Sequence, residues 1–290
     1  MRWTWRSMKK PRGCLRRAPR RACPQRASRP RLVMPSCGGD WTISIISHRH
    51  GDRVLPTLVS LAEQMGRRDY RVVLTINAPE NIDYLQRAPN ALRRRLTVVH
   101  GSHQRSFAEN HNRALLGCHS RFALALDPEL TFKGQVLDAL EATLALPRWG
   151  LGAPRAYTED GMMDDNARRM VTPRRLLQRY LTHRGGIDYD TPATETTIAV
   201  DWVAGLFMAF RSEVFQAVRG FDTRYRLYCE DVDLCLRVRQ AGYDIALLTG
   251  ERVIHPAGRR SLRELRHFRW HSHSLLRLWT SPDYRRRDKR

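Results

Sequence analysis

The sequence predicts an α/β fold with a mostly parallel sheet flanked by helices, on the basis of two observations. Runs of β-branched and apolar residues alternate with segments of helical spacing four times between Trp41 and Pro154. Polar loops follow these runs, and ligands of such sheets bind where the carboxyl ends of the strands meet loops. The chain has 290 residues, 42% of them hydrophobic, which is enough for one large or two modest domains.

The first half of the chain carries the clearest alternation. WTISIIS at 41–47 is β-branched and bounded by polar residues, so it predicts a strand, and VLPTLVSLAEQM at 54–65 predicts a helix that ends at Gly66. The later elements are the strands YRVVLTI (70–76), LTVVHG (96–101) and RFALALD (121–127), the helices SFAENHNRALLGC (106–118) and KGQVLDALEATLAL (133–146), and a strand that begins at WGLGAP (149–154).

The second half is less regular. Residues 155–200 are polar and predict loops with a short basic helix, and residues 200–221 predict a strand that leads into a short helix. YDIALLT (243–249) and RVIHP (252–256) predict two further strands. Residues 259–279 predict a basic amphipathic helix, whose apolar positions are Leu262, Leu265, Phe268, Leu275, Leu276 and Trp279.

The charge of the chain is strongly positive and unevenly distributed. The formal net charge is +22, and residues 1–38 hold twelve Lys and Arg with no acidic residue. We interpret this arm as disordered, or as lying outside the working protein if translation starts at Met34. Such a balance attracts anions: nucleic acid, anionic lipid or phosphorylated small molecules. A nucleic-acid binder is therefore the rival function, but zinc spacing, RNP-like aromatic motifs and a helix-turn-helix signal are missing, so we expect no nucleic-acid partner.

Targeting and redox signals are weak. No stretch approaches the roughly 18 consecutive apolar residues that a membrane span needs, and no apolar segment of a secretory signal follows the basic arm. The six cysteines form no CxxC pair. The sequence therefore predicts a reduced, cytoplasmic protein.

Two groups of acids are candidates for chemistry. Asp127 and Glu129 follow a predicted strand, with Pro128 between them, and such a pair can hold a divalent cation or form an ordinary polar turn. Glu230, Asp231 and Asp233 crowd the start of a predicted helix. The helix dipole alone favours acids there, but crowding raises a carboxylate's pKa and suits it to general-base work.

Other polar residues have a structural alternative beside the functional one. His255 ends a predicted strand and becomes a ligand only if it faces Asp127 and Glu129. His48 and His50 lie in the loop after the first strand, where they contact a nucleotide or serve as polar loop residues. Asn110 and Asn112, in the sequence ENHN, lie at the start of a predicted helix, where polar residues are common and often belong to a helix cap.

The order of these motifs resembles the family 2 glycosyltransferases of GT-A type, and most closely the bacterial rhamnosyltransferases of cell-surface polysaccharide assembly. The resemblance covers about residues 40–279 and is most specific over 201–242. It rests on WTISIISHRHGD, SFAENHNRAL, LALDPEL, the segment from DWVAGLF to YDIALL, and ERVIHPAGRRS. It implies a GT-A domain over residues 39–258, with a nucleotide-binding half (39–150) and an acceptor half (151–258), followed by the basic helix and tail 259–290.

The resemblance implies an inverting enzyme that transfers a sugar, with L-rhamnose from dTDP-rhamnose as the nearest match, to a hydroxyl of a glycan or lipid-linked acceptor. It implies Asp231 as base beside Glu230, and Mg²⁺ or Mn²⁺ on Asp127, Glu129 and His255. The implied nucleotide-sugar residues are His48, Asn77, Asn110, Asn112 and Asp127. Trp202, Arg168 and Arg169 are expected at the acceptor.

Three departures from the family pattern bear on these expectations. Ile76 stands where relatives often carry an Asp before the residue matching Asn77, Asp127-Pro128-Glu129 replaces Asn-Pro-Asp, and His48-Arg49 replaces Tyr-Asn. An inactive relative that only binds nucleotide sugars therefore stays an alternative. The basic C-terminal helix either lies on an anionic membrane, at the inner face of the plasma membrane, or packs on the domain. The oligomeric state is left open.

Overall fold

The computed structural model describes residues 39–182, 187–189, 196–256 and 265–287, which lie in the compact unit Ser36–Arg290. The predicted arm at residues 1–38 and the boundary at 258–259 fall outside the described residues, as do most of GGIDYDTPATET and the first part of the C-terminal tail.

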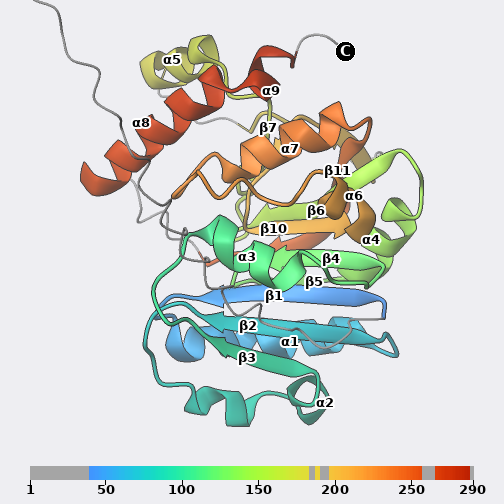
Figure 1. Cartoon of the computed structure of the whole chain (residues 1–290). Helices are drawn as coiled ribbons and strands as arrows, with labels where there is room; N and C mark the ends of the chain where they lie inside the picture. The colour runs from blue at the N-terminus through green and yellow to red at the C-terminus, as the bar shows by residue number, and fades with distance from the viewer. Residues whose placement is uncertain (1–38, 183–186, 190–195, 257–264, 288–290) are drawn as a thin grey trace, which may run out of the picture. The chain divides into compact units, whose positions relative to one another are not determined.

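The predicted nucleotide-binding half contains a parallel sheet in the order β3-β2-β1-β4 (Figure 1). Its strands are β1 (Trp41–Ser47), β2 (Tyr70–Ile76), β3 (Leu96–His100) and β4 (Phe122–Leu126). The connecting helices are η1 (Gly51–Val54), α1 (Leu55–Met65), η2 (Asp83–Arg87), α2 (Asn90–Arg93) and α3 (Phe107–Leu115). The four strands confirm the predicted alternation, and every carboxyl end reaches the same edge because the strands are parallel.

The other half of the sheet mixes strand directions. Its strands are β5 (Thr131–Lys133), β6 (Trp149–Tyr157), β8 (Thr197–Val200), β10 (Phe207–Arg211) and β11 (Asp244–Ile254). β10 lies antiparallel between β4 and β6, while β6 and β11 are parallel. β10 thus reverses direction in the middle of an otherwise mostly parallel sheet, and the repeat pattern of the sequence did not predict that reversal. A separate small sheet pairs β7 (Ala167–Arg168) with β9 (Trp202–Val203).

The prediction of two separate strands at 243–249 and 252–256 was wrong, because both segments belong to β11. Its register against β6 shifts between Leu248 and Arg252, where the facing residue of β6 is Pro154. Proline has no N–H to donate, so the ladder is interrupted there without separating the strands. On its other side, β11 pairs with β8 before the irregularity and with β5 after it.

The central strands β4 and β10 are buried on both faces and form part of the core. All five residues of β4 are buried, and so are the first four of β10. Such strands read as continuous apolar runs instead of alternating ones. The helices of this half are α4 (Val136–Leu144), α6 (Ser212–Ala217) and α7 (Glu230–Gln240).

The remaining helices are α5 (Pro173–Thr182), α8 (Leu265–Thr280) and α9 (Pro282–Arg285), which Figure 1 draws near α7. α8 confirms the predicted helix and packs part of its apolar side: Leu275 and Leu278 are buried, and the Trp279 Nε1–H donates to the Val171 carbonyl at 2.9 Å. The side chains of Leu262, Leu265 and Phe268 lie outside the described residues. Among the helices described, none combines the length and apolar character that a membrane span requires.

Candidate active site

Loops at the carboxyl ends of β1, β2 and β3 are joined through Asn77. Its Nδ2 donates to the Arg105 carbonyl (3.0 Å) and lies 3.3 Å from His48 Nδ1, while its Oδ1 accepts from the Arg105 N–H (2.9 Å). Asn110, on α3, also directs its Nδ2 at the Arg105 carbonyl, at 3.5 Å. The predicted nucleotide residues His48, Asn77 and Asn110 are therefore gathered around one short stretch of chain.

Asn112 has a different set of partners. Its Nδ2 donates to the Phe221 carbonyl (2.7 Å) and its Oδ1 accepts from the Phe221 N–H (2.8 Å). A Cβ on Gly220 would lie 2.4 Å from Asn112 Oδ1, and Gly220 has φ +64°, so a glycine is required beside this contact. Asn112 thus fixes the loop that leads toward α7, and its predicted role at the nucleotide remains a prediction.

Glu80 completes this edge, although it was not among the predicted site residues. It accepts a hydrogen bond from Ser47 Oγ (2.6 Å) and lies 3.5 Å from the Gly51 N–H and 3.4 Å from the Tyr84 hydroxyl. Ile76, where relatives often carry an Asp, is buried at the end of β2. The one available signal was an acidic residue four positions after that strand.

The predicted metal ligands lie at the end of β4 and of β11. Asp127 Oδ1 accepts from the Glu129 N–H at 2.9 Å, and burial raises the pKa of the Asp127 carboxyl. The neighbouring Asp164 carboxylate raises the pKa of His255 most, and the negative charges of Asp127 and Glu129 act in the same direction. His255 thus interacts electrostatically with both acids, and its role as a metal ligand remains a prediction.

The same residues already have protein partners. Glu129 forms an ion pair with Arg53 at 2.5 Å, and His255 Nδ1 lies 3.7 Å from Asp164 Oδ2. Within the described residues, no group of three His, Cys, Asp or Glu side chains is arranged to hold a metal ion. The donor types suit a divalent cation, but this arrangement holds them in ion pairs instead of around a common centre.

The acid pair lies at the start of α7, directly after a strained turn. Tyr228 and Cys229 have φ of 71° and 65°, in the left-handed region that non-glycine residues rarely adopt. Two such residues in succession cost on the order of 1–3 kcal/mol each and persist only where the surrounding structure enforces them. The turn delivers Glu230 and Asp231 into the protein as the first residues of a helix.

Asp231 is held by main-chain donors. Its Oδ2 accepts from the Gly205 N–H (3.0 Å) and its Oδ1 from the Val232 N–H (2.8 Å). A Cβ on Gly205 would come within 3.1 Å of the Phe107 ring, so the close approach of this N–H depends on glycine. Burial raises the pKa of Asp231, while the two N–H groups and the charge of Arg168 act in the opposite direction.

Glu230 is more deeply buried than its neighbour. Its Oε2 has no hydrogen-bond partner among the described residues, and burial together with the negative charge of Asp231 raises its pKa to about 8. Asp233 has a separate role: it is buried and pairs with Arg237 at 2.8 Å, one helical turn later. The three acids of the cluster therefore differ in environment, although they lie within four positions.

The predicted acceptor residues adjoin Asp231 through the small sheet. Arg168 on β7 pairs with Trp202 on β9, and its guanidinium lies 5.5 Å from the Trp202 ring centroid. The indole N–H of Trp202 donates to the Arg169 carbonyl at 3.0 Å, while the Arg169 guanidinium lies over the Tyr189 ring. Arg168 acts electrostatically on both Asp231 and His271. Arg168 and Trp202 thus lie together on the small sheet, and Gly205, which follows β9, binds Asp231; their role at an acceptor remains a prediction.

Comparisons with known proteins show what the chain is similar to in sequence and in fold. No protein-family model matches the chain. The sequence is 45% identical over 80 residues to the rhamnosyltransferase WbbL of Escherichia coli (strain K12), which covers 27% of this chain and 30% of that protein. It is 28% identical over 151 residues to the N-acetylglucosaminyl-diphospho-decaprenol L-rhamnosyltransferase of Mycobacterium tuberculosis, covering 46% of each. Each match thus spans less than half the length of the curated relative.

Solved structures share the fold at low sequence identity. GalNAc-T7 with UDP, GalNAc and Mn²⁺ matches 76% of this chain and 44% of its own, with a TM-score of 0.57 and 16% identity. The mannosyltransferase PcManGT from Pyrobaculum calidifontis, with GDP-Man and Mn²⁺, matches 86% and 68%, with a TM-score of 0.56 and 18% identity. The chain therefore has the GT-A fold, and parts of its sequence are similar to two bacterial rhamnosyltransferases.

Proposed function

We propose that the chain is an inverting, metal-dependent glycosyltransferase of family 2 that transfers L-rhamnose from dTDP-rhamnose to a hydroxyl of a glycan or lipid-linked acceptor in cell-surface polysaccharide synthesis. The observation that carries the proposal is Asp231: a carboxylate at the start of α7, oriented by two main-chain N–H groups beside Arg168 and Trp202. The similarity to two rhamnosyltransferases supports the choice of donor.

In the proposed reaction, Asp231 accepts the proton of the acceptor hydroxyl as its oxygen forms a bond to the anomeric carbon. The bond from that carbon to the diphosphate breaks on the opposite face, and the nucleoside diphosphate leaves with the electron pair. Burial makes Asp231 a stronger base than an exposed carboxylate, and the opposing N–H groups and Arg168 keep its ionised form accessible. A positioned base of this kind contributes about 10²–10⁴-fold.

Glu230 acts as a neighbour that tunes the base. With a pKa raised to about 8, it retains its proton at neutral pH and so adds no second negative charge next to Asp231. Two adjacent carboxylates in a buried site cannot both ionise without a large energetic cost. The protonated state of Glu230 therefore favours the ionised state of Asp231.

We assign Asp127, Glu129 and His255 as the residues that would hold Mg²⁺ or Mn²⁺. The structures of GalNAc-T7 and PcManGT were solved with Mn²⁺, and burial of the Asp127 carboxyl makes a nearby cation favourable. When bound, the metal supplies positive charge for the leaving diphosphate. Because Glu129 is paired with Arg53, its participation requires that ion pair to open.

The experiment for this proposal is a panel of nucleotide sugars, measured by thermal stabilisation with Mn²⁺ and with EDTA. We expect dTDP-rhamnose to raise the melting temperature in the presence of Mn²⁺, and Asp127→Asn to reduce this shift. A matched control is Asp160→Asn, which changes an exposed acid in the loop after β6. Equal shifts for every nucleotide sugar would contradict the donor, and equal shifts with EDTA would contradict the metal.

We further propose that the protein works at the cytoplasmic face of the plasma membrane. Leu275 and Leu278 of α8 are buried against the rest of the protein. Leu276 on α8 and Leu177 and Leu181 on α5 are exposed (61%, 59% and 68%) among basic residues. Apolar side chains flanked by Arg suit an anionic bilayer surface. Flotation with anionic liposomes, with and without residues 259–290, tests the contribution of the tail. Equal binding by the truncated and the full-length protein would contradict this contribution.

A further inference from the structure

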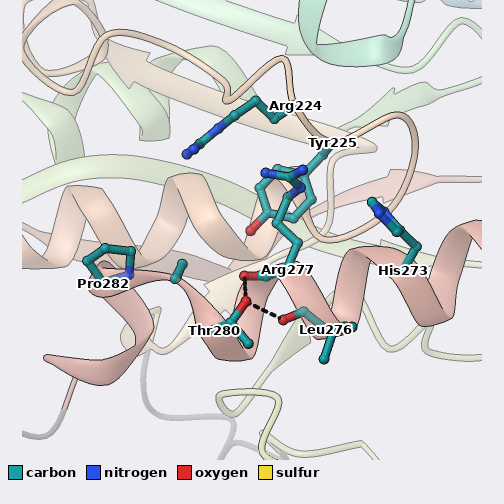
Figure 2. A pocket seen from close by; sticks show the side chains of 8 residues that line it. Arg224, Tyr225, His273, Leu276, Arg277, Thr280 and Pro282 are labelled. Atoms are coloured by element: carbon teal, nitrogen blue, oxygen red, sulfur yellow. Dashed lines mark hydrogen bonds between the residues drawn. The ribbon is translucent and has the colours of Figure 1, made fainter. Parts of the chain in front are cut away.

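A basic pocket lies between α8 and the loop that precedes α7, apart from the residues assigned to catalysis. Its volume is about 340 Å³, and Arg224, Tyr225, His273, Leu276 and Arg277 are among the residues that line it. Figure 2 shows these side chains, with Arg224 and Tyr225 on the loop and the other three on α8. The pocket thus joins two segments that are about fifty residues apart in the sequence.

The pocket is lined by hydrogen-bond donors: two guanidinium groups, an imidazole and a phenol. Arg224 is 70% exposed in its side chain and is paired with Asp222 at 2.7 Å. The Arg277 guanidinium lies 5.9 Å from the centroid of the Tyr225 ring. His273 is exposed one turn earlier on α8. Burial raises the pKa of the Tyr225 hydroxyl, so this group stays neutral and adds no negative charge to the pocket.

Arg277 carries an unsatisfied donor. Its Nε is buried, and it has no hydrogen-bond partner among the described residues. A buried donor on a charged group that lacks an acceptor is destabilising, and such groups are rare in folded proteins. The nearby Thr280 hydroxyl is directed at the carbonyls of Leu276 and Arg277 within α8, to which it donates. Because Nε itself is closed to solvent, an anion in the pocket would act on the half-buried guanidinium of Arg277 through its charge and not through Nε.

We propose that this pocket binds a phosphoryl group. Two guanidinium groups and an imidazole match the oxygen atoms of a phosphate or diphosphate, because guanidinium binds such oxygens in pairs. The pocket volume is near the lower end of the ~300–1,000 Å³ range of small-molecule sites, which suits a phosphate or diphosphate better than a whole nucleotide sugar. Leu276, exposed at the rim, offers an apolar contact to the group that carries the phosphate.

A ligand bound in this pocket would connect α8 with the loop that precedes α7. Ser274 Oγ on α8 donates to the Leu227 carbonyl at 2.8 Å, and the loop continues through the strained residues Tyr228 and Cys229 into Glu230. A phosphoryl group held by Arg224 and Arg277 would add a second bridge between this loop and α8. The site stands independently of the proposed reaction, because its lining residues are separate from Asp127, Asp231 and the β1–β3 loops.

The test uses His273 as a local reporter in the full-length protein. Histidine ring resonances are followed by NMR during titration with pyrophosphate, and His273→Gln assigns the signal. We expect a saturable shift of the His273 resonance, and at least tenfold weaker binding in the double variant Arg224→Gln, Arg277→Gln. Arg113→Gln, at an exposed arginine on α3, is the matched control and should bind as the wild type does.

Two further arms separate the sources of the phosphate and exclude misfolding. Binding to vesicles of phosphatidylglycerol, with phosphatidylcholine as reference, shows whether a lipid headgroup occupies the pocket. If the double variant no longer binds these vesicles but Arg113→Gln does, the occupant is the lipid headgroup. If only pyrophosphate binds, the source is a soluble phosphate. His273→Gln and Arg224→Gln, at exposed positions, should retain the wild-type melting temperature. The proposal is overturned if neither probe binds, or if the double variant binds both as well as the wild type.

Discussion

The two halves of the sheet hold their polar residues in different ways. In the region of β1 to β4, neutral amides such as Asn77 connect strand-end loops through hydrogen bonds, and Glu80 bonds to a hydroxyl at the same edge. In the region of α7, Glu230 and Asp231 follow a strained turn, and burial raises the pKa of both. Asp127, at the end of β4, also has a pKa raised by burial, so the difference lies in the two adjacent acids of α7 and the amide network of the other region.

This contrast teaches where substitutions should affect chemistry and where they should affect only the fold. A hydrogen-bonded amide at a loop contributes about 0.5–1.5 kcal/mol to stability. A buried carboxylate pair changes which groups are ionised at neutral pH, and so reaches the reaction directly. Three experiments probe this difference, from the largest expected effect to the smallest.

Asp231→Asn should reduce turnover by about 10²–10⁴-fold while leaving binding of the nucleotide sugar intact, because the amide retains the shape of the carboxylate and loses its basicity. The measurement is initial rate of transfer together with donor affinity by calorimetry. Asp233→Asn, on the same helix, is the contrasting variant: it breaks the buried pair with Arg237 and should lower stability first. Transfer by Asp231→Asn at the wild-type rate would remove the base from this position.

Glu230→Gln should change how stability depends on pH. In the unfolded chain the carboxyl titrates near 4.5, and in the folded protein near 8. Between these values the folded state binds more protons, so the wild-type free energy of unfolding falls as pH rises through this window. The variant should lack this fall, and the gap between the two proteins should reach the order of a few kcal/mol by pH 9.

The measurement is urea unfolding at intervals from pH 4.5 to 9, restricted to conditions where the transition is reversible. Asp231 also has a raised pKa and is present in both proteins, so it shifts both curves in the same direction. Parallel curves for wild type and Glu230→Gln would show that Glu230 is ionised in the folded state at neutral pH.

Ser106→Ala should have the smallest effect and only on stability. Ser106 and Glu109 form a capping box at the start of α3, and loss of an N-cap hydroxyl costs about 1 kcal/mol. Thermal unfolding should show a modest decrease, whereas Ser102→Ala in the preceding exposed loop should be neutral. If Ser106→Ala lost most of its transfer activity at unchanged stability, the region around α3 would contribute to the reaction and not only to the fold.

The sequence by itself determined the elements whose pattern is local. The runs at 41–47 and 121–127 became β1 and β4, the capping pair Ser106 and Glu109 begins α3, and the acids 230–233 begin α7. These outcomes follow from the apolar periods of helix and strand and from end signals, which act over a few residues. The crowding of three acids was also visible without a structure, but not which of them pairs with Arg237.

Only the tertiary structure decided the contacts that join distant segments. It reversed β10 between β4 and β6, merged 243–249 and 252–256 into β11, paired Glu129 with Arg53, and bound Asn112 to Phe221 across 109 positions. It also set Glu80 beside Ser47 and brought α8 to the loop before α7. Residue type and spacing specify which face of an element is apolar, whereas packing of the complete chain specifies which face meets which neighbour.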